Sequence, residues 1–153
     1  MLEGRIYQNA YVTRNIDQTV AAFTGQADAR SAIQFEATSE VLTAAGRRSQ
    51  TVKLAFIWVG DFQYEVIEPV REAVPLFSSW LPDGDGPRFH HSCARVDDWA
   101  SFRRRVDQTP YPVVLEGAGD GLNFLFLDTR PLLGHYMEYT WMTDFAWQRI
   151  GGR

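Results

Sequence analysis

The sequence predicts an α+β fold built from two βαβββ modules whose mixed sheet curves around a shared cleft. Short apolar runs bounded by turn residues dominate the 153-residue chain, and two helix start signals lie among them. The order strand, helix and three strands occurs twice, on either side of a segment rich in proline and glycine. We therefore expect a single domain over residues 1–153, with module one at about 5–70, a linker at about 71–88, module two at about 89–142 and a C-terminal tail at 143–153.

Module one opens with a mixed apolar run over residues 5–13, which predicts a strand. Asn15 is a suitable N-cap for a short helix over 16–23, where apolar residues recur at helical spacing. Gly60-Asp61 is short enough to form a tight hairpin between two of the strands that follow. These strands are expected at 31–37, 50–59 and 62–70.

Module two repeats this order after the linker. A strand over 89–96 leads to Asp97 or Asp98, either of which can cap a helix from residue 99 to about 106. The run of arginines at 103–105 is interpreted as a solvated face of this helix. Glycines at 117, 119 and 121, then Pro131 and Gly134, separate the last strands. These strands are expected at 113–116, 122–128 and 135–141.

Composition limits the classes of partner. The formal net charge of −4 gives no electrostatic reason to expect binding to nucleic acid or to an anionic membrane surface. No apolar run approaches the roughly 18 residues that a spanning helix needs. The single cysteine, Cys93, cannot form an internal disulfide, which favours a reducing compartment. We expect a cytoplasmic protein whose partner is a small-molecule substrate.

Polar side chains inside two predicted strands suggest a metal site. His90 and His91 lie in one strand, and Glu138 lies in another among aromatic and apolar neighbours. An imidazole and a carboxylate on neighbouring strands form half of a site for a first-row divalent metal. A buried carboxylate is costly unless it is paired or bound to a metal. Metal chemistry is therefore the first hypothesis, and a hydrogen-bonded structural role is the alternative for each residue.

Several stretches resemble the vicinal oxygen chelate superfamily, which includes glyoxalases, bleomycin-resistance proteins and extradiol dioxygenases. The resemblance spans about residues 6–141 and looks strongest to the methylmalonyl-CoA epimerase-like glyoxalase branch. It implies a glyoxalase-like fold and, for many members, a homodimer. The matching stretches are Tyr64-Glu65-Val66-Ile67-Glu68-Pro69-Val70, Phe89-His90-His91 through Val96-Asp97-Asp98, Pro112 to Gly117, and Phe124 to Arg130 through Gly134-His135-Tyr136-Met137-Glu138.

The resemblance also implies a set of four metal ligands, one on the first and last strand of each module. They fall on Gln8, Glu65, His91 and Glu138. Because successive strand residues face opposite ways, His90 is expected on the outer face or at an interface if His91 faces the metal. By the same alternation Glu68 is expected to face solvent, His135 to face away from the metal, and Cys93 to share the face of His91 as a packing residue. Gln8 departs from the epimerase pattern, in which histidine is usual.

The implied cofactor is a divalent metal ion: zinc, nickel, cobalt or manganese. The implied activity is that of an isomerase, epimerase or lyase on a small carbonyl-containing substrate, and the aromatic content of the chain favours a hydrophobic or aromatic one. Glu65 and Glu138 are the candidate catalytic bases, and Glu36 is a weaker candidate. Two alternatives stay open: a metal-free protein that sequesters a ligand, and another metalloenzyme such as a dioxygenase or thiol transferase. Specificity is expected in the loops at 44–50 and 72–88 and in the tail.

Overall fold

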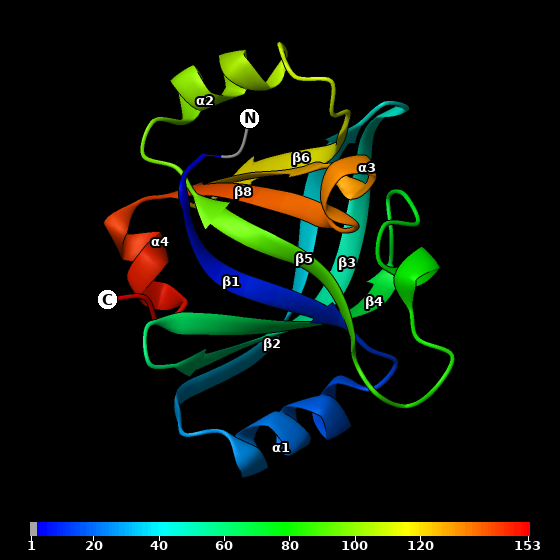
Figure 1. Ribbon diagram of the computed structural model, residues 1–153, viewed down its shortest axis with the longest axis vertical. Helices are drawn as coiled ribbons and strands as arrows, with labels where there is room; N and C mark the ends of the chain where they lie inside the picture. The colour runs from blue at the N-terminus through cyan, green and yellow to red at the C-terminus, as the bar shows by residue number, and fades with distance from the viewer. Residues whose placement is uncertain (1–2) are drawn as a thin grey trace.

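The computed structural model describes residues 3–153, except for the side chain of Arg30, and within this range eight strands close into a barrel (Figure 1). Around the barrel the strands follow the order β1-β4-β3-β2-β6-β7-β8-β5, and β5 pairs with β1 to complete the ring. The strands are β1 (Arg5–Val12), β2 (Ala29–Thr43), β3 (Gly46–Val59), β4 (Phe62–Arg71), β5 (Arg88–Arg95), β6 (Val113–Gly119), β7 (Leu122–Leu127) and β8 (Tyr136–Met142).

The two modules have the same internal pairing. The first strand of each pairs in parallel with the last, as β1 with β4 and β5 with β8, and the remaining pairs are antiparallel. The predicted curved, mixed sheet of two βαβββ modules is confirmed. The sheet closes into a ring and does not stay open along one edge, because Val41–Thr43 of β2 pairs with residues 115–117 of β6.

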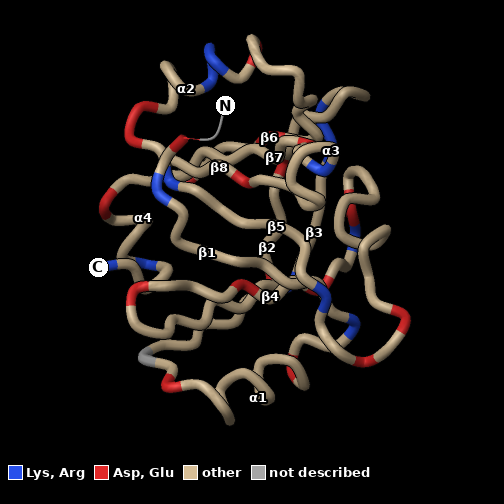
Figure 2. The backbone as a smooth tube through the Cα atoms, in the orientation of Figure 1, with Lys and Arg blue, Asp and Glu red and all other residues tan. Residues whose placement is uncertain are grey.

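Two helices cover opposite outer faces of the barrel (Figure 1). In α1 (Ile16–Gln26), Ile16 packs on Ile57 and Val66, and the predicted cap Asn15 accepts a hydrogen bond from the backbone of Gln18. In α2 (Trp99–Val106), the cap is Asp98, and Phe102 packs among apolar residues of β7 and β8. The α2 arginines, blue in Figure 2, are not simply solvated, since Arg103 pairs with Glu116 and Arg105 with Glu3. Among the helices of residues 3–153, none is both long and apolar enough to cross a membrane.

Two chain segments cover the ends of the barrel (Figure 1). At one end, the connection from β4 to β5 contains the short helix η1 (Ser78–Trp80) and inserts Leu76 and Phe77 into the core. At the other end, α4 (Asp144–Arg149) packs on a cluster that contains Trp58. The indole Nε1 of Trp58 donates a hydrogen bond to the carbonyl of Ile150 at 2.5 Å. The barrel interior therefore lies between the linker and the C-terminal tail.

The prediction missed elements that depend on short or irregular patterns. The expected loop at 44–50 is mostly strand, because β2 and β3 form one long hairpin that turns at residues 44–45. Gly46 has a φ of 93°, a conformation that glycine adopts without strain. Helices α3 (Arg130–Leu133) and α4 were not predicted as helices. Trp147 of the C-terminal tail packs on the cluster that contains Tyr7 and Trp58.

Candidate metal centre

His91 enters the barrel interior from β5 and is fully buried. Its strand is not regular there, since Ala10 of β1 pairs with His91 but Tyr11 pairs with Phe89. His90 is thus the extra residue of a β-bulge, and the alternation of side chains is broken at this point. The expectation that His90 faces outward is wrong: its ring is also fully buried, and its Nδ1 lies 2.8 Å from Nδ1 of His91.

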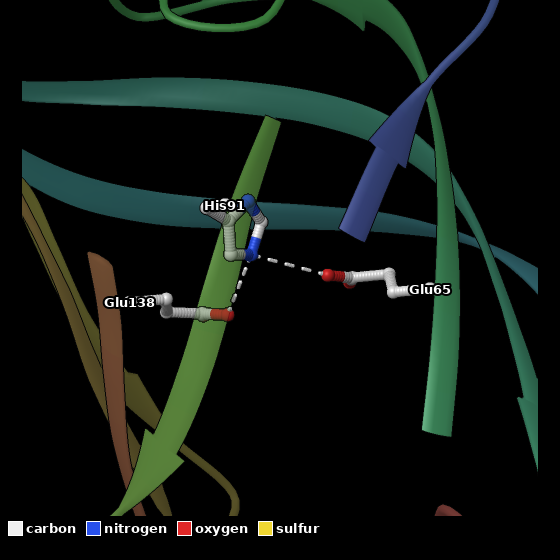
Figure 3. Close-up of side chains that lie close together, drawn as sticks. All are labelled: Glu65, His91 and Glu138. Atoms are coloured by element: carbon white, nitrogen blue, oxygen red, sulfur yellow. Dashed lines mark hydrogen bonds and ion pairs between the residues drawn. The ribbon is translucent and has the colours of Figure 1, made fainter. Parts of the chain in front are cut away.

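Glu65 of β4 and Glu138 of β8 extend toward His91 from the two sides of β1 and β5 (Figure 3). The imidazole Nε2 lies 3.1 Å from Oε2 of Glu138 and 3.5 Å from Oε2 of Glu65. One ligand atom from each of the three residues lies within 4.8 Å of the others. The structure therefore brings together three of the four residues expected at the metal.

The strand register explains why these side chains converge. Ala10 on β1 pairs with His91 on one side and with Glu65 on the other, so both side chains point to the same face as its methyl group. Cys93, two residues beyond His91, pairs with Glu138. Because Ala10 is small and buried, Glu65 and His91 can approach each other over it.

Burial and charge set the protonation of the cluster. Burial lowers the pKa of His91, but the contacts with the carboxylates of Glu138 and Glu65, together with their charges, outweigh burial and raise that pKa to about 9. Burial also raises the pKa of Glu65, and the nearby charge of Glu138 adds to this effect, while the contact with His91 opposes it. Two carboxylates beside one cation leave the cluster with an excess negative charge in a largely buried space.

Gln8 is buried on β1, in the row of residues next to the cluster, where it pairs with Cys93 and Gln63. The amide nitrogen of Gln63 donates to the carbonyl of Ile150 at 3.5 Å, which leaves the oxygen of Gln63 facing Gln8. That oxygen accepts from Nε2 of Gln8 at 2.6 Å. Among the described residues, Oε1 of Gln8 consequently has no hydrogen-bond partner. Gln8 thus offers a free acceptor oxygen, and its role as a fourth ligand stays a prediction.

These donors fit a divalent metal ion. Oε2 of Glu65 is buried and, like Oε1 of Gln8, makes no hydrogen bond within residues 3–153; Nε2 of His91 lies 3.5 Å from it. An acceptor of this kind is costly unless a cation or a donor approaches it. Imidazole nitrogen and carboxylate oxygen together suit zinc, nickel, cobalt or manganese. A divalent charge would also offset the repulsion between Glu65 and Glu138.

The remaining candidates lie away from the cluster. Glu36 is exposed on β2, opposite Lys53, so its expected role as a weaker base is not supported by its position. Glu68 faces the side opposite to Glu65, as expected, but it is not simply solvated. Its carboxylate accepts from the backbone of Ile16 at 2.8 Å and from Lys53 at 2.7 Å.

His135 and Cys93 lie on the faces of the sheet where they were expected, His135 away from the cluster and Cys93 on the face of His91. His135 lines a hollow of about 310 Å³ on the outer side of β5 and β8, and none of the three clustered residues lines that hollow. Cys93 is buried between β1 and β8, where burial raises the pKa of its thiol well above the usual range. A thiol in this state packs rather than reacts.

Sequence reasoning missed two polar residues that contact the candidate ligands. His90 contacts His91, and Gln63 contacts Gln8. Gln63 lies two residues before Glu65, so strand alternation alone places both on the same face. No comparable signal exists for His90, because the bulge that turns it inward is created by pairing between β5 and β1.

The fold and the site together define a class of protein: barrels of two βαβββ modules that present polar side chains inward from the first and last strand of each module. A family model described as the glyoxalase/bleomycin resistance protein/dioxygenase superfamily matches residues 7–126. The chain belongs to this superfamily. A comparison with curated protein sequences gives no match.

Solved structures share the fold at low sequence identity. A hypothetical protein from Bacillus halodurans has a TM-score of 0.66 at 17% identity, with 92% of this chain and 95% of that chain covered. Methylmalonyl-CoA epimerase from Mycobacterium tuberculosis has a TM-score of 0.65 at 16% identity, with 95% of each chain covered. A Streptomyces coelicolor methylmalonyl-CoA epimerase variant in complex with 2-nitronate-propionyl-CoA has a TM-score of 0.65 at 16% identity, covering 92% of this chain and 96% of that chain.

Proposed function

We propose that this protein is a divalent-metal-dependent isomerase, epimerase or lyase that acts on a small carbonyl-containing substrate. The observation that carries the proposal is the convergence of Glu65, His91 and Glu138 inside the barrel, where the buried Oε2 of Glu65 lies 3.5 Å from Nε2 of His91 and makes no hydrogen bond with the described residues. Glu65, His91 and Glu138 would hold the ion, and the free oxygen of Gln8 would face it as a fourth donor. A bound divalent ion supplies Lewis acidity toward substrate oxygens.

The chain's own part in the reaction is proton transfer. Glu65 is the better placed base, because burial raises its pKa toward the range in which a carboxylate accepts a proton efficiently. Glu138 is the second candidate, since 13% of its side chain is exposed to solvent and to an incoming molecule. In an epimerase or isomerase, one of these carboxylates removes a proton from the carbon next to a carbonyl and returns it.

Aromatic side chains beside the carboxylates favour an apolar substrate group. Phe56 is the cross-strand neighbour of Glu65, and Phe126 is the cross-strand neighbour of Glu138. The ring of Phe126 also meets His91 edge to face, with centroids 4.9 Å apart. Phe35, which is 39% exposed, meets Phe56 edge to face, with ring centroids 5.5 Å apart. These rings exclude water from the cluster and provide an apolar surface next to it.

Acyl thioesters are the first substrates to test, because related folds are solved with methylmalonyl-CoA and 2-nitronate-propionyl-CoA. The test is incubation of the zinc-, nickel-, cobalt- or manganese-loaded protein in D₂O with α-substituted acyl thioesters, α-hydroxy thioesters and small ketones. Deuterium entering the α position, followed by NMR, is expected for the wild type and not for Glu65→Gln. Absence of exchange in the whole panel with every metal would refute proton transfer as the activity.

A metal-free protein that sequesters a ligand is the second candidate. It is favoured by the ion pair of His91 with Glu138, which gives the imidazole a buried partner without a metal. Binding of an aromatic ligand by the metal-free protein, with no competing uptake of Zn²⁺, would support this function instead.

A further inference from the structure

The bulge in β5 brings the imidazoles of His90 and His91 into contact, and the structure determines which ring donates the hydrogen bond between them. Nε2 of His90 lies 3.1 Å from the backbone carbonyl oxygen of Leu76. A carbonyl oxygen can only accept a hydrogen bond, so Nε2 of His90 must carry the proton. The ring is fully buried between the aromatic rings of Phe77 and Tyr136, where a charged imidazole is costly, so the ring is neutral and its Nδ1 bears no proton.

This leaves only one arrangement for the contact between the rings. Because Nδ1 of His90 is an acceptor, Nδ1 of His91, 2.8 Å away, must be the donor. Nε2 of His91 is then the nitrogen that can present a lone pair, and it is the atom nearest to Glu138 and Glu65. The carbonyl of Leu76, the ring of His90 and the ring of His91 thus form a chain of hydrogen bonds that runs from the linker to the carboxylates.

We propose that His90 is a positioning residue that holds His91 in the tautomer with hydrogen on Nδ1, so that Nε2 faces the metal ion. Its consequence for metal affinity rests on the function proposed above. Hydrogen bonds to the far nitrogen of a ligating histidine set the ring's orientation and strengthen metal binding about 10–100-fold in known sites. A neutral histidine is unusual in this role, because carboxylates and carbonyls are the common partners.

The surroundings hold His90 rigidly enough for this role. Its ring stacks on Tyr136 with centroids 5.0 Å apart and contacts Phe77 and Trp80 of the linker at 5.1 and 6.0 Å. Leu76 is itself fixed by a backbone hydrogen bond to Val74 at 2.7 Å. Residues of the linker therefore contact His90, and His90 in turn contacts His91.

The protonation pattern can be measured without metal or substrate. Long-range ¹H–¹⁵N NMR of the metal-free protein at pH 7 should show neutral His90 protonated on Nε2 alone. The zinc-loaded protein should show His91 protonated on Nδ1 alone. His90 protonated on Nδ1, or on both nitrogens, would overturn the inference whether or not the protein binds a metal.

Matched variants test the consequence for binding, with Zn²⁺ alone as the probe. His90→Asn keeps an acceptor oxygen near the position of Nδ1 and should bind Zn²⁺ within about threefold of the wild type. His90→Phe keeps the ring packing but has no acceptor, and should weaken binding about 10–100-fold. His135→Phe, on the outer face, is the control and should bind as the wild type does.

The outcomes separate this inference from the proposed function. If the wild type does not bind Zn²⁺, the proposed function fails, and the NMR pattern alone decides whether His90 has the stated tautomer. If the wild type binds Zn²⁺ but His90→Phe binds equally well, the positioning role is wrong. An equal loss in His90→Asn and His90→Phe would likewise contradict it, because the restored acceptor would have made no difference.

Discussion

Metal affinity should depend steeply on pH, because the metal must displace a proton from His91. In the metal-free protein the pKa of His91 is raised to about 9, so Nε2 carries a proton at neutral pH. Below that pKa each unit of pH changes the fraction of free ligand about tenfold, since one proton is released. From pH 6 to pH 8 the apparent affinity for Zn²⁺ should therefore rise about 100-fold.

Competition for Zn²⁺ with a chromophoric chelator from pH 6 to pH 8 measures how steeply the apparent affinity rises with pH. His135→Gln removes a histidine that lies outside the cluster and should leave the slope unchanged. His91→Gln has no such proton and should bind weakly with a nearly flat dependence. A wild-type affinity that stays constant from pH 6 to pH 8 would refute the role given to His91.

The same proton affects the stability of the metal-free protein with the opposite trend. The pKa of His91 in the folded protein, about 9, lies above its ordinary value of 6.5. The stabilisation by its ion pairs is therefore complete below about pH 6.5 and is lost as pH rises through 9. Urea unfolding of metal-free protein should show a free energy of unfolding that falls over this window by at most about 1.4 kcal/mol per pH unit.

Other predictions concern the carboxylate, the cap and the tail. Glu138→Gln should weaken Zn²⁺ binding by at least about 10-fold in the same competition assay, and equal affinity would remove Glu138 from the ligand set. Asn15→Ala should lower the free energy of unfolding by about 1 kcal/mol in urea titrations, because the backbone N–H of Gln18 loses its acceptor at the N-terminus of α1. An unchanged unfolding midpoint would contradict this. Trp58→Phe removes the indole bond to Ile150 and should speed hydrogen exchange in residues 144–152 while the exchange of β3 amides stays unchanged. Exchange that does not change in the tail would show that α4 is held by packing alone.

Local patterns were sufficient to predict most strands and both long helices. The alternation of apolar residues and the caps at Asn15 and Asp98 involve residues that are close together in the sequence, so the sequence alone reveals them. The extra length of β2 and β3 was missed because residues 44–50 contain glycine and arginines that indicate a loop. Helices α3 and α4 span four and six residues, which is too short for a helical period to appear.

The candidate site was predictable where it follows strand alternation and unpredictable where pairing departs from it. The family resemblance selected Glu65 as the ligand, and strand alternation then placed Glu68 on the opposite face of β4. His90 was misplaced because its inward turn depends on the shift between Ala10 and Tyr11 on another strand. Closure of the barrel through β2 and β6 is likewise a long-range pairing. The homodimer expected from the resemblance stays a prediction, which sedimentation of the purified protein can test.

Elemental analysis of protein purified without chelator tests the central claim most directly. Glu65, His91 and Glu138 should retain about one equivalent of zinc, nickel, cobalt or manganese per chain, and His91→Ala should retain none. Wild-type protein that emerges without metal, and that takes up none when each of the four ions is added at pH 8, would show that the buried carboxylates and imidazole serve another purpose.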